Sequence, residues 1–331
     1  MQLFFVTYIV SLAKNRMMLS FLRLIRFQNL LIIAFVQYAM RFAVILPLLR
    51  LYGIEFQLSG FTFFCLVFAT MSTAAAGYAI NDYFDVKTDK INRPDKVVVG
   101  RSISRRQTMM THIVFCATGI LLGGYVTWKA GIPELALVYI VVAGMLWLYS
   151  TIYKQQLIIG NIIVALFSAL VPMMVLLDIP LIYRIDGHYL LEKSVNLDFA
   201  VIWISGVAVF AFLTSLSREI IKDAEDFEGD VAYGCRSLPI VLGDRFTKWT
   251  VICINAIIVV LLGFVCWYSY CLAGYFSFFY ILILLVIPFV FISRKVYQAT
   301  TSDDYRRAGD WIKLLMLAGI AYSGIVWFIS N

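Results

Sequence analysis

The sequence has little of what a histidine- or thiolate-based active site would need. Among 331 residues there are only two histidines, His112 and His188, and they fall in separate segments. The six cysteines are scattered, and no pair has the CxxC spacing of a zinc or redox site. Transition-metal chemistry and a catalytic triad are therefore poorly supported, and the cysteines are expected to be free, structural thiols.

Charged residues are also scarce. They make up 14% of the chain, whereas hydrophobic residues make up 62% and the mean hydropathy is +0.87. Soluble domains carry about 25% charged residues, so this composition lies well outside their range. It predicts an integral, multi-pass membrane protein.

Nine apolar runs are long enough to cross a bilayer, which takes roughly 17–25 residues of helix. They lie at 27–49, 59–80, 107–128, 132–150, 157–177, 198–216, 249–272, 275–293 and 310–329. Residues 1–22 are expected to form a leading interfacial segment, because their apolar stretch is interrupted after about a dozen residues and no cleavage signal is evident. The predicted fold is an all-α bundle of nine transmembrane helices in one domain, 1–331.

Basic residues are distributed unevenly between the two sides of this topology. Of the 27 lysines and arginines, 22 fall before the first run or in the connections on the same side, and four fall on the other side. The positive-inside rule places the rich side, including the amino terminus, in the cytoplasm of a cell (inner or plasma) membrane. The net charge of +7 is explained by this asymmetry, so nucleic-acid binding is not invoked.

Two features lie away from that basic side. Arg41 falls inside the first run, where an ionisable residue is a functional candidate by default. Because it lies twelve residues past Asn29, or about 18 Å along a helix, a structural role facing the bundle is favoured. The segment 178–197 is polar without any ligand spacing, and it is expected to be a surface loop.

Three carboxylates follow the second apolar run. The stretch Asn81–Asp89 reads NDYFDVKTD, and Asp82, Asp85 and Asp89 stand at i, i+3 and i+7, which is one face of a continuing helix. Asn81 adds an amide oxygen one turn before Asp85. Such an all-oxygen set suits a hard cation such as Mg²⁺. A solvated acidic helix end is the alternative interpretation.

A second acidic run follows the sixth apolar run. Here the chain reads SREIIKDAEDFEGD, and Asp223, Asp226 and Asp230 repeat the same spacing on the same side of the membrane. Basic residues accompany both runs, and both lead into similar Arg-Ser motifs, which suggests a weak internal repeat. A salt-bridged loop at the membrane surface would show similar alternation, but it gives no reason for the spacing to recur.

Together the runs predict a particular chemistry. Acids that hold Mg²⁺ bind a diphosphate through the metal, while arginine and lysine bind the remaining oxygens. On a prenyl diphosphate this makes diphosphate a better leaving group and generates an allylic cation. An apolar, aromatic-rich bundle stabilises such a cation and excludes water from it.

At this point the chain resembles a known family, the UbiA-type intramembrane prenyltransferases. The first run has the form NDxxDxxxD and continues as INRPDKVVVGRSIS, and the second has the form KDxxDxxGD followed by GCRSLPIVLG. The entry segment RLIRFQNL, residues 23–30, is also similar. The resemblance covers nearly the whole chain, and it implies a helical bundle around a central apolar cavity with cytoplasmic cap loops.

The resemblance also implies roles for individual residues. The expected metal and diphosphate ligands are Asn81, Asp82, Asp85, Asp89, Asp223, Asp226 and Asp230, with Asp82, Asp85, Asp223 and Asp226 as the catalytic acids. The expected substrate-binding residues are Asn29, Asn81, Arg93, Tyr149, Lys154, Arg218 and Lys222, with Ser150 beside Tyr149. Arg218 stands where many members have tyrosine, which leaves its role open. Glu219 is most simply an ion-pair partner of Arg218 or Lys222.

The second motif looks most like that of the members that join geranylgeranyl diphosphate to the free hydroxyl of geranylgeranylglyceryl phosphate. The expected partners are thus a prenyl diphosphate donor, a lipid-like acceptor and the bilayer, with Mg²⁺ as cofactor. An aromatic-ring prenyltransferase of quinone biosynthesis is the alternative, and a secondary transporter is a remote one, because transporter ion sites lie near the bilayer midplane. The sequence leaves the prenyl chain length and the oligomeric state open.

Overall fold

The computed structural model describes residues 17–192 and 196–330 of the chain. Its elements are α2 (Phe27–Ala39), η1 (Met40–Ile45), α3 (Leu46–Leu51), α4 (Gly60–Asn92), η2 (Pro94–Lys96), α5 (Arg105–Lys129), η3 (Pro133–Leu135), α6 (Ala136–Thr151), η4 (Tyr153–Gln155), α7 (Ile159–Met173), η5 (Met174–Leu177), α8 (Asp178–Glu192), α9 (Asp198–Glu225), α10 (Phe227–Ala232), α11 (Leu238–Ile281), η6 (Leu282–Val286), α12 (Ile287–Gln298) and α13 (Ser302–Ser330). Within those ranges the only β-structure is an isolated bridge between Val99 and Ile103. The prediction of an all-α protein is confirmed.

The expected membrane helices are present. In the described part of the chain, eight helical stretches are long and apolar enough to span a bilayer: Phe27–Leu51, Gly60–Asn92, Arg105–Lys129, Pro133–Thr151, Ile159–Leu190, Asp198–Glu225, Leu238–Tyr268 and Tyr275–Gln298. They correspond in order to the first eight apolar runs. Helix α13 covers the ninth run, whose crossing of the membrane stays a prediction.

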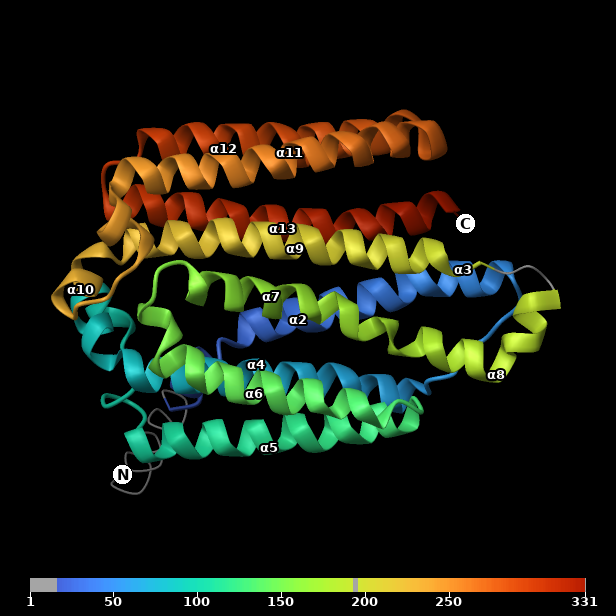
Figure 1. Ribbon diagram of the computed structural model, residues 1–331, viewed down its shortest axis with the longest axis horizontal. Coiled ribbons are helices and arrows are strands. Elements are labelled where there is room, and N and C mark those ends of the chain that lie inside the picture. The colour runs from blue at the N-terminus through green and yellow to red at the C-terminus, as the bar shows by residue number, and fades with distance from the viewer. Residues whose placement is uncertain (1–16, 193–195, 331) are drawn as a thin grey trace, which may run out of the picture.

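The helices run nearly parallel to the long axis of the molecule (Figure 1). Helices α11 and α12 form one outer layer and pack against α9 and α13, while α4, α5 and α6 lie on the opposite side. One buried core joins α2, η1, α4 and α9, and a second joins α9, α11, α12 and α13. Helix α9 contributes to both cores and therefore connects the two halves of the bundle.

The end of α4, helix α10 and the short η2 and η4 turns gather at one end of the bundle, whereas α3 and α8 lie at the other (Figure 1). Both acidic runs are therefore at the same end. This is the arrangement that the shared side of the two sequence motifs predicts.

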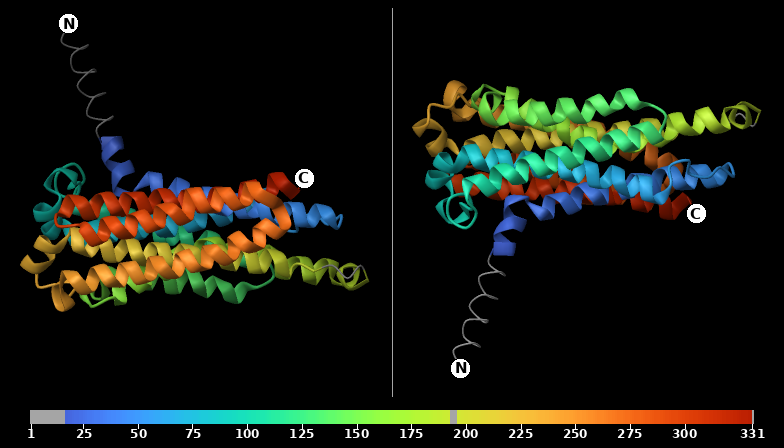
Figure 2. Two further views of the ribbon diagram at one scale, coloured as in Figure 1. Left: turned by 90° about the horizontal axis from the view of Figure 1, so that it is seen from above. Right: turned by 90° about the horizontal axis from the view of Figure 1, so that it is seen from below.

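The leading segment is described only in part, because its residues 1–16 lie outside the described ranges. Residues 17–24 form a helix that turns away from the axis of α2 (Figure 2). The corner is Arg26, whose φ of 48° lies in the left-handed region that non-glycine residues seldom adopt. Met17, Met18 and Leu19 are about half exposed, as an interfacial segment would require, and that role stays a prediction.

Arg41 faces the interior of the bundle, as the sequence favours. Its side chain is 4% exposed, and its guanidinium lies over the rings of Phe56 and Phe63 at 4.1 and 4.2 Å from their centroids. Arg41 Nη2 also donates to the carbonyl of Leu58 at 2.6 Å. This arginine joins η1 to the start of α4 at the end opposite the acids, so it has no contact with them.

Residues 178–192 of the segment 178–197 form a helix, so the prediction of a surface loop was wrong for this part. Asp178–Glu192 forms helix α8, which continues from α7 through the single turn of η5. Two of its acids contact the 52–58 connection: Asp178 Oδ1 accepts from the amide of Leu58, and Asp186 accepts from Gln57. Asp178 is 2% exposed. The polar composition suggested a loop because the hydrogen-bond partners of these acids lie about 120 residues or more earlier in the chain.

Candidate active site at the acidic end of the bundle

The first acidic run is a continuous part of α4, as its spacing predicts, and it occupies the last turns of that helix. Asn81 Nδ2 donates to Asp85 Oδ2 at 2.6 Å, and both residues are 8% exposed. Asn81 Oδ1 is buried and has no hydrogen-bond partner within the described structure. A buried, unpartnered carbonyl oxygen next to a carboxylate is a site that calls for a cation or a donor.

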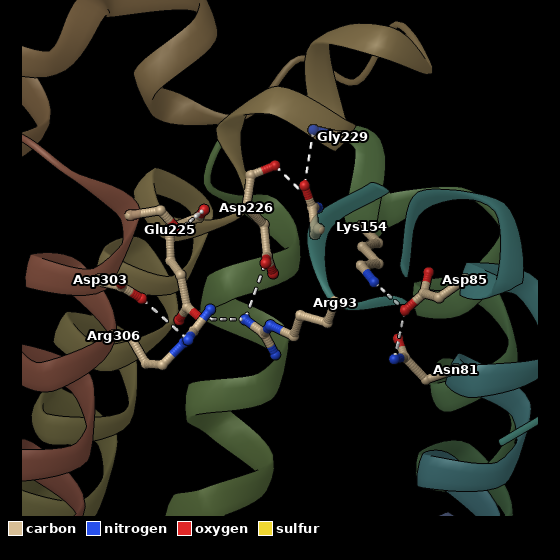
Figure 3. Close-up of polar contacts among 11 residues, drawn as sticks. Asn81, Asp85, Arg93, Lys154, Glu225, Asp226, Gly229, Asp303 and Arg306 are labelled. Carbon is tan, nitrogen blue, oxygen red and sulfur yellow. Dashed lines mark hydrogen bonds and ion pairs between the residues drawn. The ribbon is translucent and has the colours of Figure 1, made fainter. Parts of the chain in front are cut away.

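Lys154 neutralises Asp85. It lies on η4, between α6 and α7, and its Nζ is hydrogen-bonded to Asp85 Oδ2 (Figure 3). Burial lowers the pKa of Lys154, but the charge of Asp85 and the hydrogen bond to it outweigh burial, so the pKa is raised and the ammonium stays charged.

The η4 turn packs closely on α7. A Cβ at Gly160 would lie 3.0 Å from the carbonyl of Tyr153 and 3.1 Å from the Cα of Lys154. The absence of a side chain at Gly160 thus allows Lys154 to approach α4. Tyr149 lies at the same place, 3.2 Å from that Cβ position.

Arg26 forms the second ion pair of this run. Its Nη2 is 2.9 Å from Asp82 Oδ1, and its guanidinium lies 4.8 Å from the centroid of Tyr78. The left-handed backbone of Arg26 directs this side chain toward α4 from the corner before α2. Strained backbone of this kind persists where the surrounding contacts determine it, and such residues cluster at functional sites.

The second acidic run is built differently from the first. Helix α9 ends at Glu225, Asp226 has φ −90° and ψ 10°, and α10 begins at Phe227. Asp223, Asp226 and Asp230 therefore do not lie on one uninterrupted helix, unlike the acids of the first run. The equal spacing is kept, but the helix is interrupted between Asp223 and Asp230.

Asn92, the last residue of α4, contacts the backbone at this break. Its Nδ2 donates to the carbonyl of Asp226 at 3.1 Å, and its Oδ1 accepts from the amide of Gly229 at 2.8 Å. The Gly229 amide is a first-turn donor of α10 without a partner in its own helix, so Asn92 satisfies it, whereas the Asp226 carbonyl also accepts from the amide of Asp230 at 3.1 Å. A Cβ at Gly229 would lie 2.5 Å from the Asn92 amide, so only glycine fits there.

Arg93 completes the link between the two runs (Figure 3). Its Nη2 lies 2.9 Å from Asp226 Oδ1 and 3.0 Å from Glu225 Oε1. Glu225 in turn accepts from Arg306 at 2.9 Å, and Arg306 also lies 3.1 Å from Asp303 on α13. An arginine adjacent to the first motif therefore pairs with the acids of the second.

The remaining acids have fewer partners. Asp223 accepts from Asn161 Nδ2 of α7 at 2.8 Å. Asp89 and Asp230 form no side-chain hydrogen bond or ion pair with any residue that the structure describes. Burial raises the pKa of Asp230 to about 6, partly offset by the charge of Lys154. A buried carboxylate without a cation holds its proton into mildly acidic conditions, and a bound cation would displace that proton.

The other expected substrate residues divide into two groups. Lys222 lies within electrostatic range of Asp89, Asp223 and Asp230, so it belongs with the acids. Ser150 instead donates to the carbonyl of Leu146 within α6 and is 7% exposed. It is a buried helix residue here and forms no hydrogen bond with the acids in the described structure.

Asn29 and Arg218 lie on the side of the acids nearest α2 and α13. Arg218 Nη1 is 2.8 Å from Glu219, which confirms the expected ion pair. Asn29 Oδ1 accepts from Lys313 Nζ of α13 at 2.7 Å.

The residues fit a hard metal ion by chemistry, although not by their present conformation. In the described ranges no three His, Cys, Asp or Glu side chains are close enough together to hold a metal ion. The reason is that Asp82, Asp85 and Asp226 each contact a base instead. The unpartnered Asn81 Oδ1, together with the carboxylates of Asp89 and Asp230, supplies the oxygen ligands that Mg²⁺ prefers.

Comparison with known proteins agrees with this geometry. The family model for the UbiA prenyltransferase family matches residues 25–317, which is most of the chain and includes both acidic runs. The chain belongs to the UbiA prenyltransferase family. It is accordingly a prenyltransferase, and its eight apolar helical stretches make it an integral, multi-pass membrane protein.

Individual relatives of this UbiA prenyltransferase are similar to it over different lengths. It is 29% identical to the digeranylgeranylglyceryl phosphate synthase of Methanosphaera stadtmanae, over 76% of this chain and 82% of the relative. The match with the synthase of the same name from Pyrococcus horikoshii is 33% identical but spans about half of each chain, at 52% and 53%.

A solved structure of a digeranylgeranylglyceryl phosphate synthase superposes with a TM-score of 0.58 and 21% identity, over 94% of this chain and 99% of that one. A UbiA homologue from Archaeoglobus fulgidus, bound to DMAPP and Mg²⁺, gives 0.52 and 17%, over 92% and 99%. At these identities the superpositions support the shared fold.

Sequence reasoning missed several residues of the site. Asn92 and Glu225 lie inside the quoted motifs, so their position was a usable signal. Asn161, Arg306 and Lys313 lie on α7 and α13, far from either motif in sequence, and no local pattern identifies them.

Proposed function

We propose that this prenyltransferase transfers a geranylgeranyl group from geranylgeranyl diphosphate to the hydroxyl of geranylgeranylglyceryl phosphate and releases diphosphate, with Mg²⁺ as cofactor. The observation that carries the proposal is the joining of the two acidic runs at one end of the bundle by Asn92 and Arg93. The relatives that share the name digeranylgeranylglyceryl phosphate synthase support the choice of acceptor.

The oxygen ligands in this proposal are Asn81, Asp82, Asp85, Asp89, Asp223, Asp226 and Asp230. Mg²⁺ bound there would neutralise the acids and the diphosphate together, and would make diphosphate a better leaving group. The presence of Mg²⁺ and DMAPP in the Archaeoglobus fulgidus homologue supports this assignment.

The bases have a second role in the proposal. Lys154 and Arg93 each neutralise a carboxylate in the structure. When those carboxylates bind a cation, the ammonium and guanidinium groups are released to donate to diphosphate oxygens, which form charge-assisted hydrogen bonds with both. Lys222 lies close enough to the same acids to contribute a third positive charge.

The bond changes balance without any further reactant. The bond between C1 of the prenyl group and the diphosphate oxygen breaks, and its electron pair leaves with diphosphate. The acceptor oxygen forms a new bond to C1, and the hydroxyl proton passes to the released diphosphate. Tyr149 lies beside the Lys154 turn, where its ring is placed to stabilise positive charge on the prenyl group.

The proposal includes the orientation and extent of the enzyme. We place the amino terminus and the acidic end of the bundle in the cytoplasm, because the basic residues gather on that side. The whole chain, 1–331, forms a single catalytic domain, and α9 supports this because it belongs to both buried cores.

The test is a matrix of donors and acceptors with the purified protein in vesicles, scored by product mass. We expect product from geranylgeranyl diphosphate and geranylgeranylglyceryl phosphate with Mg²⁺, and none with a chelator. Product only with aromatic acceptors would replace the proposal by the quinone-type alternative. Net transport without diphosphate release would contradict prenyl transfer altogether.

A further inference from the structure

A group of three basic residues, Lys313, Arg218 and Arg26, lies beside the acids, and among the described residues Lys313 forms no ion pair with any of them. Lys313 of α13 is half-buried, and its Nζ donates to Asn29 Oδ1 of α2 at 2.7 Å. In the described structure Lys313 forms no ion pair within 4.0 Å. The nearby Asp310 is exposed one turn earlier on the same helix. A half-buried ammonium whose hydrogen-bond partner is a neutral amide retains most of its positive field.

Two arginines reinforce that field. Arg218 and Arg26 both lie within electrostatic range of Lys313, and both also act on Glu219. Each arginine has one carboxylate, Glu219 for Arg218 and Asp82 for Arg26. The cluster thus brings three cations together with two ion-paired acids, and the third acid near Lys313, Asp310, is exposed, where solvent screens its charge. Lys154 and Arg93 at the acidic runs, in contrast, each pair directly with a carboxylate. The unmatched charge calls for an anion.

The anion cannot be the donor's diphosphate alone, because the acidic runs and their own bases already account for that group. The proposed reaction brings a second anion, since the acceptor carries a phosphate monoester. Arginine and lysine donors are the usual partners of such a group.

The cluster lies where the acceptor phosphate has to be. Glycerol has a three-carbon backbone, so the phosphate and the reacting hydroxyl are at most two carbon atoms apart. A phosphate subsite must therefore adjoin the diphosphate site. Arg26 meets this requirement, because its guanidinium is 2.9 Å from Asp82 of the first run. The side-chain amide of Asn29 connects Lys313 to the same part of α4. Its Oδ1 accepts from Lys313, and its Nδ2 is 3.5 Å from the hydroxyl of Tyr78, whose ring Arg26 also contacts.

We propose that Lys313 and Arg218, with Arg26, form the subsite for the phosphate of the acceptor, and so make the enzyme select a phosphorylated glycerol ether over its neutral alcohol. This rests on the proposed function, and it identifies Lys313 as a substrate-binding residue that neither acidic motif contains. It also gives Arg218, which departs from the tyrosine of many family members, a specificity role.

The experiment measures steady-state kinetics with two acceptors, geranylgeranylglyceryl phosphate and unphosphorylated geranylgeranylglycerol. Lys313→Met and Arg218→Met should each raise the KM for the phosphorylated acceptor by about tenfold or more, since a charge-assisted hydrogen bond is lost. The KM for geranylgeranyl diphosphate should change by less than about twofold. The ratio of kcat/KM between the two acceptors should fall by the same factor as the KM rises.

Two controls separate this result from a loss of folding. Lys313→Arg keeps the charge and should retain most of the discrimination. Arg307→Met removes an exposed positive charge from the same helix and should change neither KM. An intact rate with the neutral alcohol in Lys313→Met would show that the variant is folded.

Two outcomes overturn the inference alone. One is discrimination unchanged in both methionine variants, and the other is an equal rise in the KM for the diphosphate donor, which would assign the cluster to diphosphate. If the wild-type enzyme makes no product from geranylgeranyl diphosphate with either acceptor, the proposed function fails first and this inference fails with it.

Discussion

The first acidic run lies within one helix, whereas the second crosses a break between α9 and α10. Their spacing in sequence is the same. In the first run the amide partner, Asn81, comes from the same helix, and in the second it is Asn161 from α7. The first run therefore takes its shape from local helix geometry, and the second takes its shape from contacts with other helices.

The comparison also shows how the two runs depend on each other. Asn92 and Arg93 follow the first run in sequence, but their contacts are with the backbone and carboxylates of the second. A change in the second run thus reaches the first through two adjacent residues. If the runs form one site, a substitution in either run should impair the whole reaction.

The largest effect is expected from single substitutions that remove a carboxylate from either run. Asp85→Asn and Asp226→Asn should each lower kcat by at least about 10²-fold, because a preorganised charge at the diphosphate is lost. The measurement is product formation under saturating Mg²⁺ and donor, with folding checked by size-exclusion chromatography. If either variant kept a near-normal rate, the runs would not be acting as one site.

The next effect concerns the contact that joins the runs. Gly229→Ala places a methyl group 2.5 Å from the Asn92 amide, so either this side chain or the α9–α10 break must shift, and the Asn92 hydrogen bonds are disturbed in both cases. We expect a loss of stability of about 1–3 kcal/mol and a lower rate. Thermal unfolding and product formation measure the two effects.

Gly206→Ala is the matched control for that substitution, because a Cβ at Gly206 in α9 would meet nothing within 4 Å. It should leave both the rate and the stability nearly unchanged. Equal behaviour of the two variants would contradict the structural role assigned to Asn92 and Gly229.

A smaller effect should distinguish the support of each run. Asn161→Ala removes the hydrogen bond that holds Asp223. It should lower the affinity for Mg²⁺ by about 10-fold to 100-fold, as the loss of a hydrogen-bond partner of a metal ligand does. The measurement is the Mg²⁺ concentration that gives half-maximal rate. An unchanged value would mean that Asp223 is positioned by α9 alone.

The smallest effect is chemical and needs no turnover. Burial, and next the charge of Asp230, raises the pKa of the Cys235 thiol to about 11, so little thiolate exists at pH 8. Asp230→Asn removes the second cause. A fall of half a pKa unit would speed alkylation of Cys235 about threefold.

Peptide mass spectrometry after timed alkylation measures that rate. Glu228→Gln, an exposed acid on the same short helix, is the control and should leave it unchanged. Faster alkylation in Glu228→Gln, or an unchanged rate in Asp230→Asn, would contradict the placement of Asp230 beside this thiol.

The sequence was sufficient for the helices and for one run, because both depend on local periodicity. Apolar length predicted the eight spanning stretches, and the i, i+3, i+7 spacing predicted the carboxylates of α4. For the second run the spacing gave no sign of the helix break, where the backbone is contacted by Asn92, more than 130 residues earlier in the chain. Helix α8 failed for the same reason, because its buried Asp178 is partnered by the amide of Leu58.

The ion pairs were harder still to predict. Arg93 follows the first run in sequence, but it pairs with Glu225 and Asp226 of the second. Arg26 and Lys313 reach the site through a left-handed corner and through a helix near the carboxyl terminus. Such contacts depend on how whole helices pack, which no local pattern contains.

The position of Asn92 in the chain has a consequence for biosynthesis. Helix α4 leaves the ribosome long before Asp226 does, and the amino-terminal part of a protein generally folds first. When α9 enters the membrane, the side chain that partners its carboxyl end is already in place. The later half of the protein is therefore completed on a template made by the earlier half, and a chain stopped between them would carry Asn92 without the backbone groups that it holds.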